Sequence, residues 1–226
     1  MNKLDIKSLL KPSILLIFSA ILFSTLMDQY LTKQVESIIS SKDGLSNMIW
    51  VWGGLSVLSA ILFPLLTSLF CAYFLITSTK SLNEFVEDNF ELSLIETLRA
   101  WGKTFLWSFV FLLPGVIKYI NYILTPFVVM FSKKYKRGEV DALEYSTVIS
   151  KTFFWSIKMW LGIFYVIVPV LFYALFDEYR IFSDHPFAAT IVVGLETVVE
   201  IIFHFILLNL FIKFLNANEV ENGSHV

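Results

Sequence analysis

The chain has 226 residues, of which 57% are hydrophobic and only 16% are charged. Soluble domains are about 45–50% apolar and about 25% charged, so this composition and a mean hydropathy of +0.72 exclude an ordinary soluble protein and indicate an integral membrane protein. The net charge of -2 lacks the basic excess of nucleic-acid-binding proteins. A single cysteine, Cys71, excludes an intramolecular disulfide.

Two apolar runs open the chain. Lysines precede the first, Ile14 to Met27, and no cleavage site follows it, which predicts an uncleaved signal anchor that forms the first span. The polar connection from Leu31 to Asn47 predicts a loop with a short surface helix and a turn at Asp43-Gly44. The second run, Met48 to Ile76, contains no charged residue and exceeds the roughly 20 residues that a span requires.

A short amphipathic helix and an interrupted apolar stretch come next. Ser81 and Glu84 form a capping-box pattern at the start of the helix, and its acidic face favours packing against the protein's own helices over contact with an anionic leaflet. Pro114-Gly115 and Lys118 interrupt the stretch from Trp101 to Phe131. We expect a tight hairpin of two short spans; the alternative is a re-entrant hairpin, because irregular backbone is tolerated at membrane depth where protein covers it.

The last third of the chain predicts another amphipathic helix and two more spans. The helix runs from Asp141 towards Lys151, the fifth span covers Thr152 to Phe176, and the sixth covers Phe187 to Leu215. The sequence therefore predicts an all-α polytopic membrane bundle of about six transmembrane helices with one short Pro-Gly hairpin. Residues 1–215 are expected to form a single transmembrane domain and residues 216–226 a polar tail. Four prolines within apolar runs predict kinks, or the broken helices of a transporter: Pro64, Pro114, Pro126 and Pro169.

The distribution of Lys and Arg near the span ends predicts the orientation. With a cytoplasmic N-terminus, the inner side holds Lys3, Lys7, Lys11, Lys80, Arg99, Lys103, Lys133, Lys134, Lys136, Arg137, Lys151 and Lys213. The outer side holds only Lys33, Lys42, Lys118 and Arg180, and Lys158 lies inside the membrane. Both termini are therefore expected in the cytoplasm, and a re-entrant hairpin would preserve this assignment.

Three ionisable residues form the most informative pattern. Glu196, Glu200 and His204 recur every four residues within the sixth span, so they share one helix face that must meet protein or water. Because the fifth and sixth spans should be antiparallel neighbours, we expect Lys158 to pair with Glu200, and Lys118 is the nearest candidate for Glu196.

Four interpretations of this polar stripe stay open. It could be an ion-pair and hydrogen-bond network that fixes helix register, a proton or ion relay, or a pocket for a small ligand or lipid headgroup. A metal site is the fourth, although the chain has no HExxH pattern and no second His-rich helix.

The remaining features are less specific. The basic cluster of Lys133, Lys134, Lys136 and Arg137 could contact lipid headgroups or simply determine topology. The chain has no GxSxG, Walker A or GxGxxG motif, and its polar loops are too short for an active-site domain, so we expect no catalytic residues and no cofactor.

A resemblance covers about residues 95 to 165. Leu113 to Tyr119, then Tyr122, Pro126, Ala142-Leu143, Ser146, Lys151 and Trp155 resemble the bacterial membrane families similar to the glycerophosphoryl diester phosphodiesterase membrane domain (YciC-like). The resemblance implies a polytopic helical module of the bacterial inner membrane. It transfers no functional residues, and this chain lacks the phosphodiesterase domain.

Together these observations predict a non-enzymatic membrane module that binds lipids or another membrane protein, such as an accessory subunit of a membrane complex. The alternative is a small proton- or ion-coupled transporter or channel that uses the polar stripe. Nucleic acid is not an expected partner.

Overall fold

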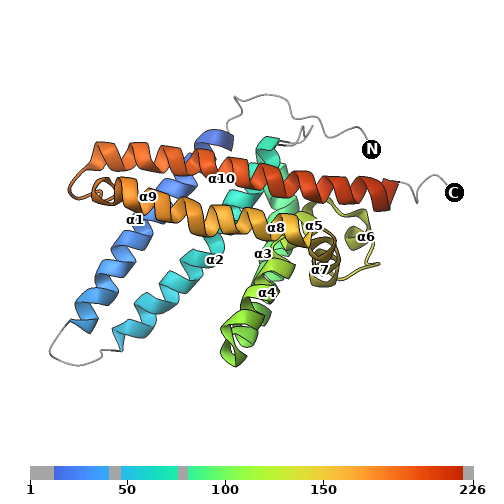
Figure 1. The fold of residues 1–226 in the computed structure, drawn as a ribbon, viewed down its shortest axis with the longest axis horizontal. Helices are drawn as coiled ribbons and strands as arrows, with labels where there is room; N and C mark the ends of the chain where they lie inside the picture. Colours follow the sequence, from blue (N-terminus) through green and yellow to red (C-terminus); the bar gives the residue numbers. More distant parts are fainter. Residues whose placement is uncertain (1–12, 41–46, 76–80, 221–226) are drawn as a thin grey trace.

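The computed structural model describes residues 13–40, 47–75 and 81–220, and these residues form helices and no strand. Figure 1 shows the helices in chain order. They are α1 (Ser13–Ile39), α2 (Met48–Leu75), α3 (Leu82–Val110), α4 (Leu112–Tyr122), α5 (Thr125–Phe131), α6 (Lys133–Lys136), α7 (Ala142–Thr152), α8 (Phe154–Gly162), α9 (Val168–Phe176) and α10 (Pro186–Leu215). Short π-helical turns follow α8 and α10, namely η1 (Ile163–Ile167) and η3 (Asn216–Val220), and a 3-10 turn, η2 (Asp177–Tyr179), follows α9.

The predicted all-α membrane fold is confirmed. Five segments of the described chain are long and apolar enough to span a membrane, namely Ile14–Ile39, Met48–Leu75, Leu112–Phe131, Phe154–Tyr179 and Pro186–Asn218. The sequence predicted about six spans, and the difference lies in α3. This helix is continuous from Leu82 to Val110, so the predicted third span is its C-terminal part, and the apolar residues after Lys103 are too few to qualify alone.

The predicted hairpin forms between α3 and α4, but its turn is at Phe111 and not at Pro114-Gly115. Phe111 has extended backbone angles and ends α3 while starting α4. Gly115 is buried against Ser108, and a Cβ at this position would lie 2.0 Å from Oγ and 3.0 Å from Cα of Ser108. The glycine therefore allows the two helix backbones to approach closely, as small residues do in membrane helix pairs.

One local prediction is wrong. Helix α1 continues to Ile39, so no separate surface helix follows the first span. The first residues of the predicted polar tail, Asn216–Val220, form a π-helical turn after α10. The predicted turn at Asp43-Gly44, together with residues 1–12, 76–80 and 221–226, lies outside the described residues.

Local sequence signals explain several helix starts. The capping box is confirmed: Glu84 N donates to Ser81 Oγ at 3.4 Å, and Ser81 N donates to Glu84 Oε2 at 3.1 Å. Asp141 caps α7 by accepting from the backbone N–H groups of Leu143 and Glu144, and its carboxylate also pairs with Arg99. That ion pair ties the start of α7 to α3.

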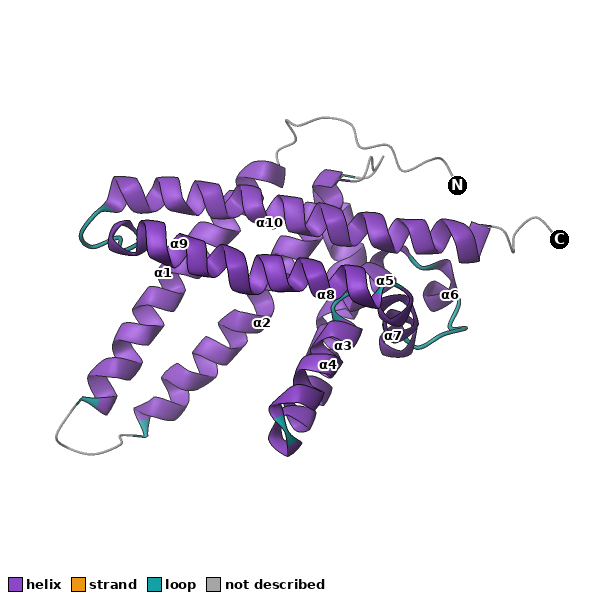
Figure 2. Ribbon diagram, viewed as in Figure 1, coloured by secondary structure: helices purple, strands orange, loops and turns teal. Residues whose placement is uncertain are grey.

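Figures 1 and 2 show α8, η1 and α9 running beside α10, with the α1–α2 and α3–α4 hairpins diverging from that layer. The end of the molecule that carries α5 to α7 is packed by protein. There Ser146 Oγ of α7 donates to Asn121 O at the end of α4, at 2.8 Å, and Leu124, Val128 and Ile149 are fully buried. A pocket opens between the two diverging hairpins.

Candidate functional site: an intramembrane pocket

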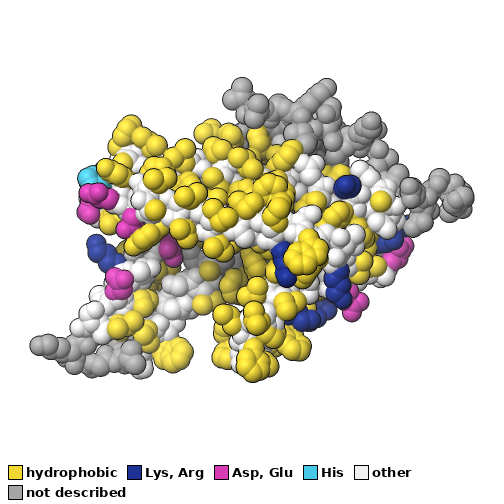
Figure 3. Space-filling view, viewed as in Figure 1, with side chains coloured by type: hydrophobic (Ala, Val, Ile, Leu, Met, Phe, Trp, Pro, Cys, Tyr) yellow, Lys and Arg dark blue, Asp and Glu magenta, His cyan; other side chains and the backbone are white. Residues whose placement is uncertain are grey.

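A cavity of about 570 Å³ lies between the two hairpins and α10. Residues of α1, α2, α3, α4, α5, η1, α9 and α10 line it, and most of its wall is apolar. Figure 3 shows the hollow on the molecular surface below the α8–α9 layer. Most of the lining comes from segments that are long and apolar enough to span a membrane.

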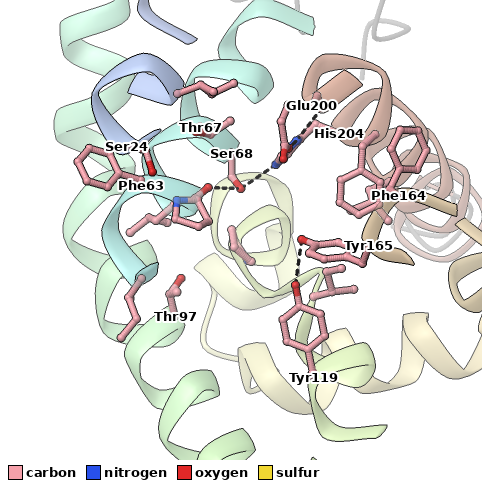
Figure 4. Close-up of a pocket in the computed structure, with 18 of the residues that line it drawn as sticks. Ser24, Phe63, Thr67, Ser68, Thr97, Tyr119, Phe164, Tyr165, Glu200 and His204 are labelled. Atoms are coloured by element: carbon pink, nitrogen blue, oxygen red, sulfur yellow. Dashed lines mark hydrogen bonds and ion pairs between the residues drawn. The ribbon is translucent and has the colours of Figure 1, made fainter. Parts of the chain in front are cut away.

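The polar stripe of α10 forms one side of this pocket. Glu196, Glu200 and His204 all line it, as expected for residues four apart on one helix face. Figure 4 shows Glu200 and His204 together on the α10 side, across the pocket from Ser24, Thr67 and Thr97.

Glu196 pairs with an arginine from the α9–α10 connection. Arg180 Nη2 lies 2.8 Å from Glu196 Oε1, so the predicted pairing of Glu196 with Lys118 is wrong. The backbone next to Arg180 is fixed to α1, because Gln29 Nε2 donates to Arg180 O at 2.8 Å and Gln29 Oε1 accepts from Phe182 N at 3.5 Å. These contacts hold the guanidinium at the pocket wall.

Glu200 belongs to a network that includes His204 and Ser68. Its Oε2 lies 3.4 Å from Nδ1 of His204, and the same nitrogen is 2.9 Å from the Glu200 backbone oxygen. Nε2 of His204 is 3.0 Å from Ser68 Oγ, which also lies 2.8 Å from Pro64 O. Ser68 of α2 thus brings a hydroxyl to the α10 stripe (Figure 4).

The predicted ion pair between Lys158 and Glu200 does not form among the described residues. The Lys158 ammonium instead lies 4.1 Å from the ring centroid of Phe154 and 5.4 Å from that of Trp155. Lys118 likewise lies 5.3 Å from the Trp107 ring centroid. Both long side chains have enough reach to direct their charge towards aromatic faces, away from the carboxylates that sequence spacing assigned to them.

Hydroxyl groups supply the other polar contacts of the pocket. Tyr119 OH donates to Tyr165 OH at 3.0 Å across the cavity, as Figure 4 shows. Tyr165 sits in η1, four residues before Pro169, which has no N–H to donate back to it. Thr97 and Thr125 line the same pocket, and their buried Oγ1 atoms have no hydrogen-bond partner among the residues that the structure describes.

The arrangement offers a binding site with charged and polar groups. Nowhere in residues 13–40, 47–75 and 81–220 do three His, Cys, Asp or Glu side chains gather to hold a metal ion. The basic cluster is separate from the pocket: Lys133, Lys136 and Arg137 are exposed on and just after α6, and Lys134 lies over the Tyr145 ring at 5.9 Å.

Sequence reasoning missed several pocket residues. Arg180 was counted only for topology, although its place in a short connection beside the stripe was a usable signal. Ser68, Thr97, Thr125 and Tyr165 carried no such signal, because they lie on separate helices that only the tertiary fold brings together.

No protein-family model, no curated protein and no solved structure matches this chain. The resemblance of residues 95 to 165 stays a prediction, and the functional argument rests on the geometry of the pocket.

Proposed function

We propose that the protein is a non-enzymatic membrane module that binds a lipid in the pocket between the α1–α2 hairpin, the α3–α4 hairpin and α10. The observation that carries this proposal is a mostly apolar cavity of about 570 Å³, lined mainly by candidate spans, with charged groups on one side. Ligand pockets generally have volumes of about 300–1,000 Å³, apolar walls and a few polar groups that orient the ligand. An amphipathic lipid fits such a pocket, because its hydrocarbon chain can contact the apolar wall and its headgroup the charged groups.

A matched pair of variants on α1 tests the proposal. Ser24 lines the pocket, whereas Ser19 is exposed on the same helix and does not line it. Ser24→Trp should fill the cavity and reduce the lipid retained in native mass spectrometry at least about tenfold, a loss of about 1.4 kcal/mol in binding. Ser19→Trp should retain lipid like the wild type, and equal retention by both variants would contradict the proposal.

A small proton- or ion-coupled transporter is the second candidate, and one observation favours it. The cavity reaches Glu200 and His204, the residue types that intramembrane proton relays use. Proteoliposomes containing a pH-sensitive dye separate the two functions: a transporter would produce an ion-dependent pH change that Glu200→Gln abolishes. The lipid-binding module would produce none.

For the membrane itself, we propose the bacterial inner membrane with both termini in the cytoplasm and membrane lipids as the main partners; the partner could also be another membrane protein. Charge asymmetry supports this orientation, since Lys and Arg on the visible face of Figure 3 gather mainly at the end that carries α6 and α7. Lys133, Lys134, Lys136 and Arg137 would then face anionic headgroups.

Cysteine labelling tests this topology. The native Cys71 is fully buried, whereas Lys136 and Asp184 are exposed. An impermeant thiol reagent should label Asp184→Cys, and not Lys136→Cys, from outside the cell. The reverse pattern would contradict the orientation.

A further inference from the structure

The pocket contains one carboxylate that pairs with no Lys or Arg side chain of the described residues. Its ionisable side chains, apart from tyrosines, are Arg180, Glu196, Glu200 and His204. Arg180 and Glu196 form an ion pair at 2.8 Å, so their charges cancel. The excess negative charge of the pocket is therefore on Glu200 unless His204 carries a proton.

The Glu200 carboxylate is also open to a ligand. Its side chain is 44% exposed, against 20% for Glu196. Oε2 contacts His204 at 3.4 Å, but Oε1 has no hydrogen-bond or ion-pair partner within the described chain. A carboxylate at membrane depth is unfavourable unless a cation or a proton compensates it.

The hydrogen bonds of His204 can be formed by the neutral imidazole. Nδ1–H can donate to the Glu200 backbone oxygen at 2.9 Å, and Nε2 can accept from the Ser68 hydroxyl at 3.0 Å. The single proton of that hydroxyl serves either Nε2 or Pro64 O, which lies 2.8 Å away. Whichever nitrogen of His204 carries a proton, the ring reaches only Oε2 of the Glu200 carboxylate, and Oε1 stays available to a ligand.

Two unpartnered hydroxyls lie in residues of the pocket wall. Within the described residues, Oγ1 of Thr125 and Oγ1 of Thr97 are buried and have no hydrogen-bond partner. Thr125 begins α5, and the ring of Phe127 in the same helix lies 6.4 Å from the His204 ring, so α5 meets the α10 stripe here. Buried hydroxyls are normally hydrogen-bonded, and they can accept from an N–H donor.

We propose that the pocket binds the primary ammonium group of an amphipathic molecule. Glu200 accepts a charge-assisted hydrogen bond from the ammonium, and the hydrocarbon chain packs against the apolar wall. A quaternary ammonium has no N–H and cannot donate to this carboxylate. The inference rests on the proposed lipid-binding function, and an aminated phospholipid and a free long-chain amine share the required chemistry.

Native mass spectrometry with three phospholipids of identical acyl chains tests the inference. Phosphatidylethanolamine has a primary ammonium, phosphatidylcholine has the N-methylated form, and phosphatidylglycerol has none. The wild type should retain the ethanolamine lipid at least about tenfold better than the other two, as expected for one charge-assisted hydrogen bond. Glu200→Gln, which preserves side-chain size, should remove the preference, whereas Glu178→Gln, outside the pocket, should keep it.

A competition with dodecylamine and dodecanol identifies the source of the ammonium. Displacement of the ethanolamine lipid by the amine alone supports ammonium recognition, and binding of the amine without the lipid assigns the site to a free amine. An unchanged lipid preference in Glu200→Gln would overturn ammonium recognition and leave lipid binding intact. Equal retention of all three lipids by the wild type would do the same, provided that Ser24→Trp still blocks this retention. Retention that Ser24→Trp does not reduce would overturn lipid binding itself.

Discussion

The Leu112–Phe131 and Phe154–Tyr179 segments are both apolar enough to span a membrane, yet the protein surrounds them differently. Their mean hydropathies are 1.4 and 2.2, but 44% of the first apolar window is buried inside the protein against 6% of the second. The first has Gly115, Asn121 and Thr125 facing other helices, whereas the second exposes Val166, Val170 and other large apolar side chains. High hydropathy thus indicates that a segment can lie in a membrane, while small and polar residues within it indicate that other helices pack around it.

The largest expected effect comes from adding one methyl group to each segment. In Gly115→Ala the new Cβ would lie 2.9 Å from Cβ and 3.0 Å from Cα of Ser108 and would clash with both atoms. This substitution should cost about 1–3 kcal/mol of unfolding free energy. In Gly162→Ala the Cβ meets nothing within 4 Å, and the better helix propensity should stabilise by up to about 1 kcal/mol. Unfolding in detergent measures both; equal effects would remove the contrast between the segments.

A smaller effect is expected where α7 joins the packed half. Asp141→Ala removes a helix cap, which is worth about 1 kcal/mol. It also removes the ion pair with Arg99. Because the Arg99 and Asp141 side chains are 43% and 28% exposed, this ion pair is worth at most about 1 kcal/mol. Asp141→Asn keeps a capping oxygen and loses mainly the ion pair, so it should be less destabilising than Asp141→Ala. Equal losses of unfolding free energy would mean that the cap contributes nothing.

Acid should weaken the same junction. Burial acts to raise the pKa of Asp141, but the hydrogen bonds from Arg99 and from the backbone of Glu144 and Leu143 outweigh burial and lower it. Because the folded pKa is below the unfolded value of about 3.9, the stabilisation is fully present above that pH and is lost as the pH falls through the folded pKa. The difference in unfolding free energy between the wild type and Asp141→Asn should therefore disappear as the pH falls from about 4 through the folded pKa of Asp141. A difference that persists in stronger acid would contradict this.

The smallest effect is expected for a double-mutant cycle of Lys158→Met and Glu200→Gln. A buried ion pair would give a coupling of about 3–5 kcal/mol. Since the Lys158 ammonium lies over the rings of Phe154 and Trp155, the two losses should add to within about 0.5 kcal/mol. A larger coupling free energy would restore the ion pair that sequence spacing predicts.

Much of the fold follows from local sequence patterns. The predicted run from Met48 and the predicted span from Phe187 to Leu215 lie within one residue of α2 and α10, because hydropathy and helix-start signals act over a few residues. The α3 boundary was harder, since its charged first half and apolar second half look like two elements in sequence and form one helix.

The candidate site was only partly predictable. The spacing of Glu196, Glu200 and His204 determines that they share a face, so their common lining of one pocket followed from the 3.6-residue period. Their partners depend on tertiary structure: Arg180 reaches Glu196 from a connection that Gln29 fixes to α1, and no local pattern records that contact.

Photo-crosslinking tests lipid binding in the pocket most directly. A phospholipid with a diazirine in its acyl chain is added to the purified protein, and the labelled peptides are mapped by mass spectrometry. Lipid binding in the pocket should give saturable adducts at pocket residues such as Phe63 and Phe127, and unlabelled lipid should displace them. Adducts confined to outward-facing residues such as Leu171 and Tyr173, with no saturable labelling of the pocket, would contradict it.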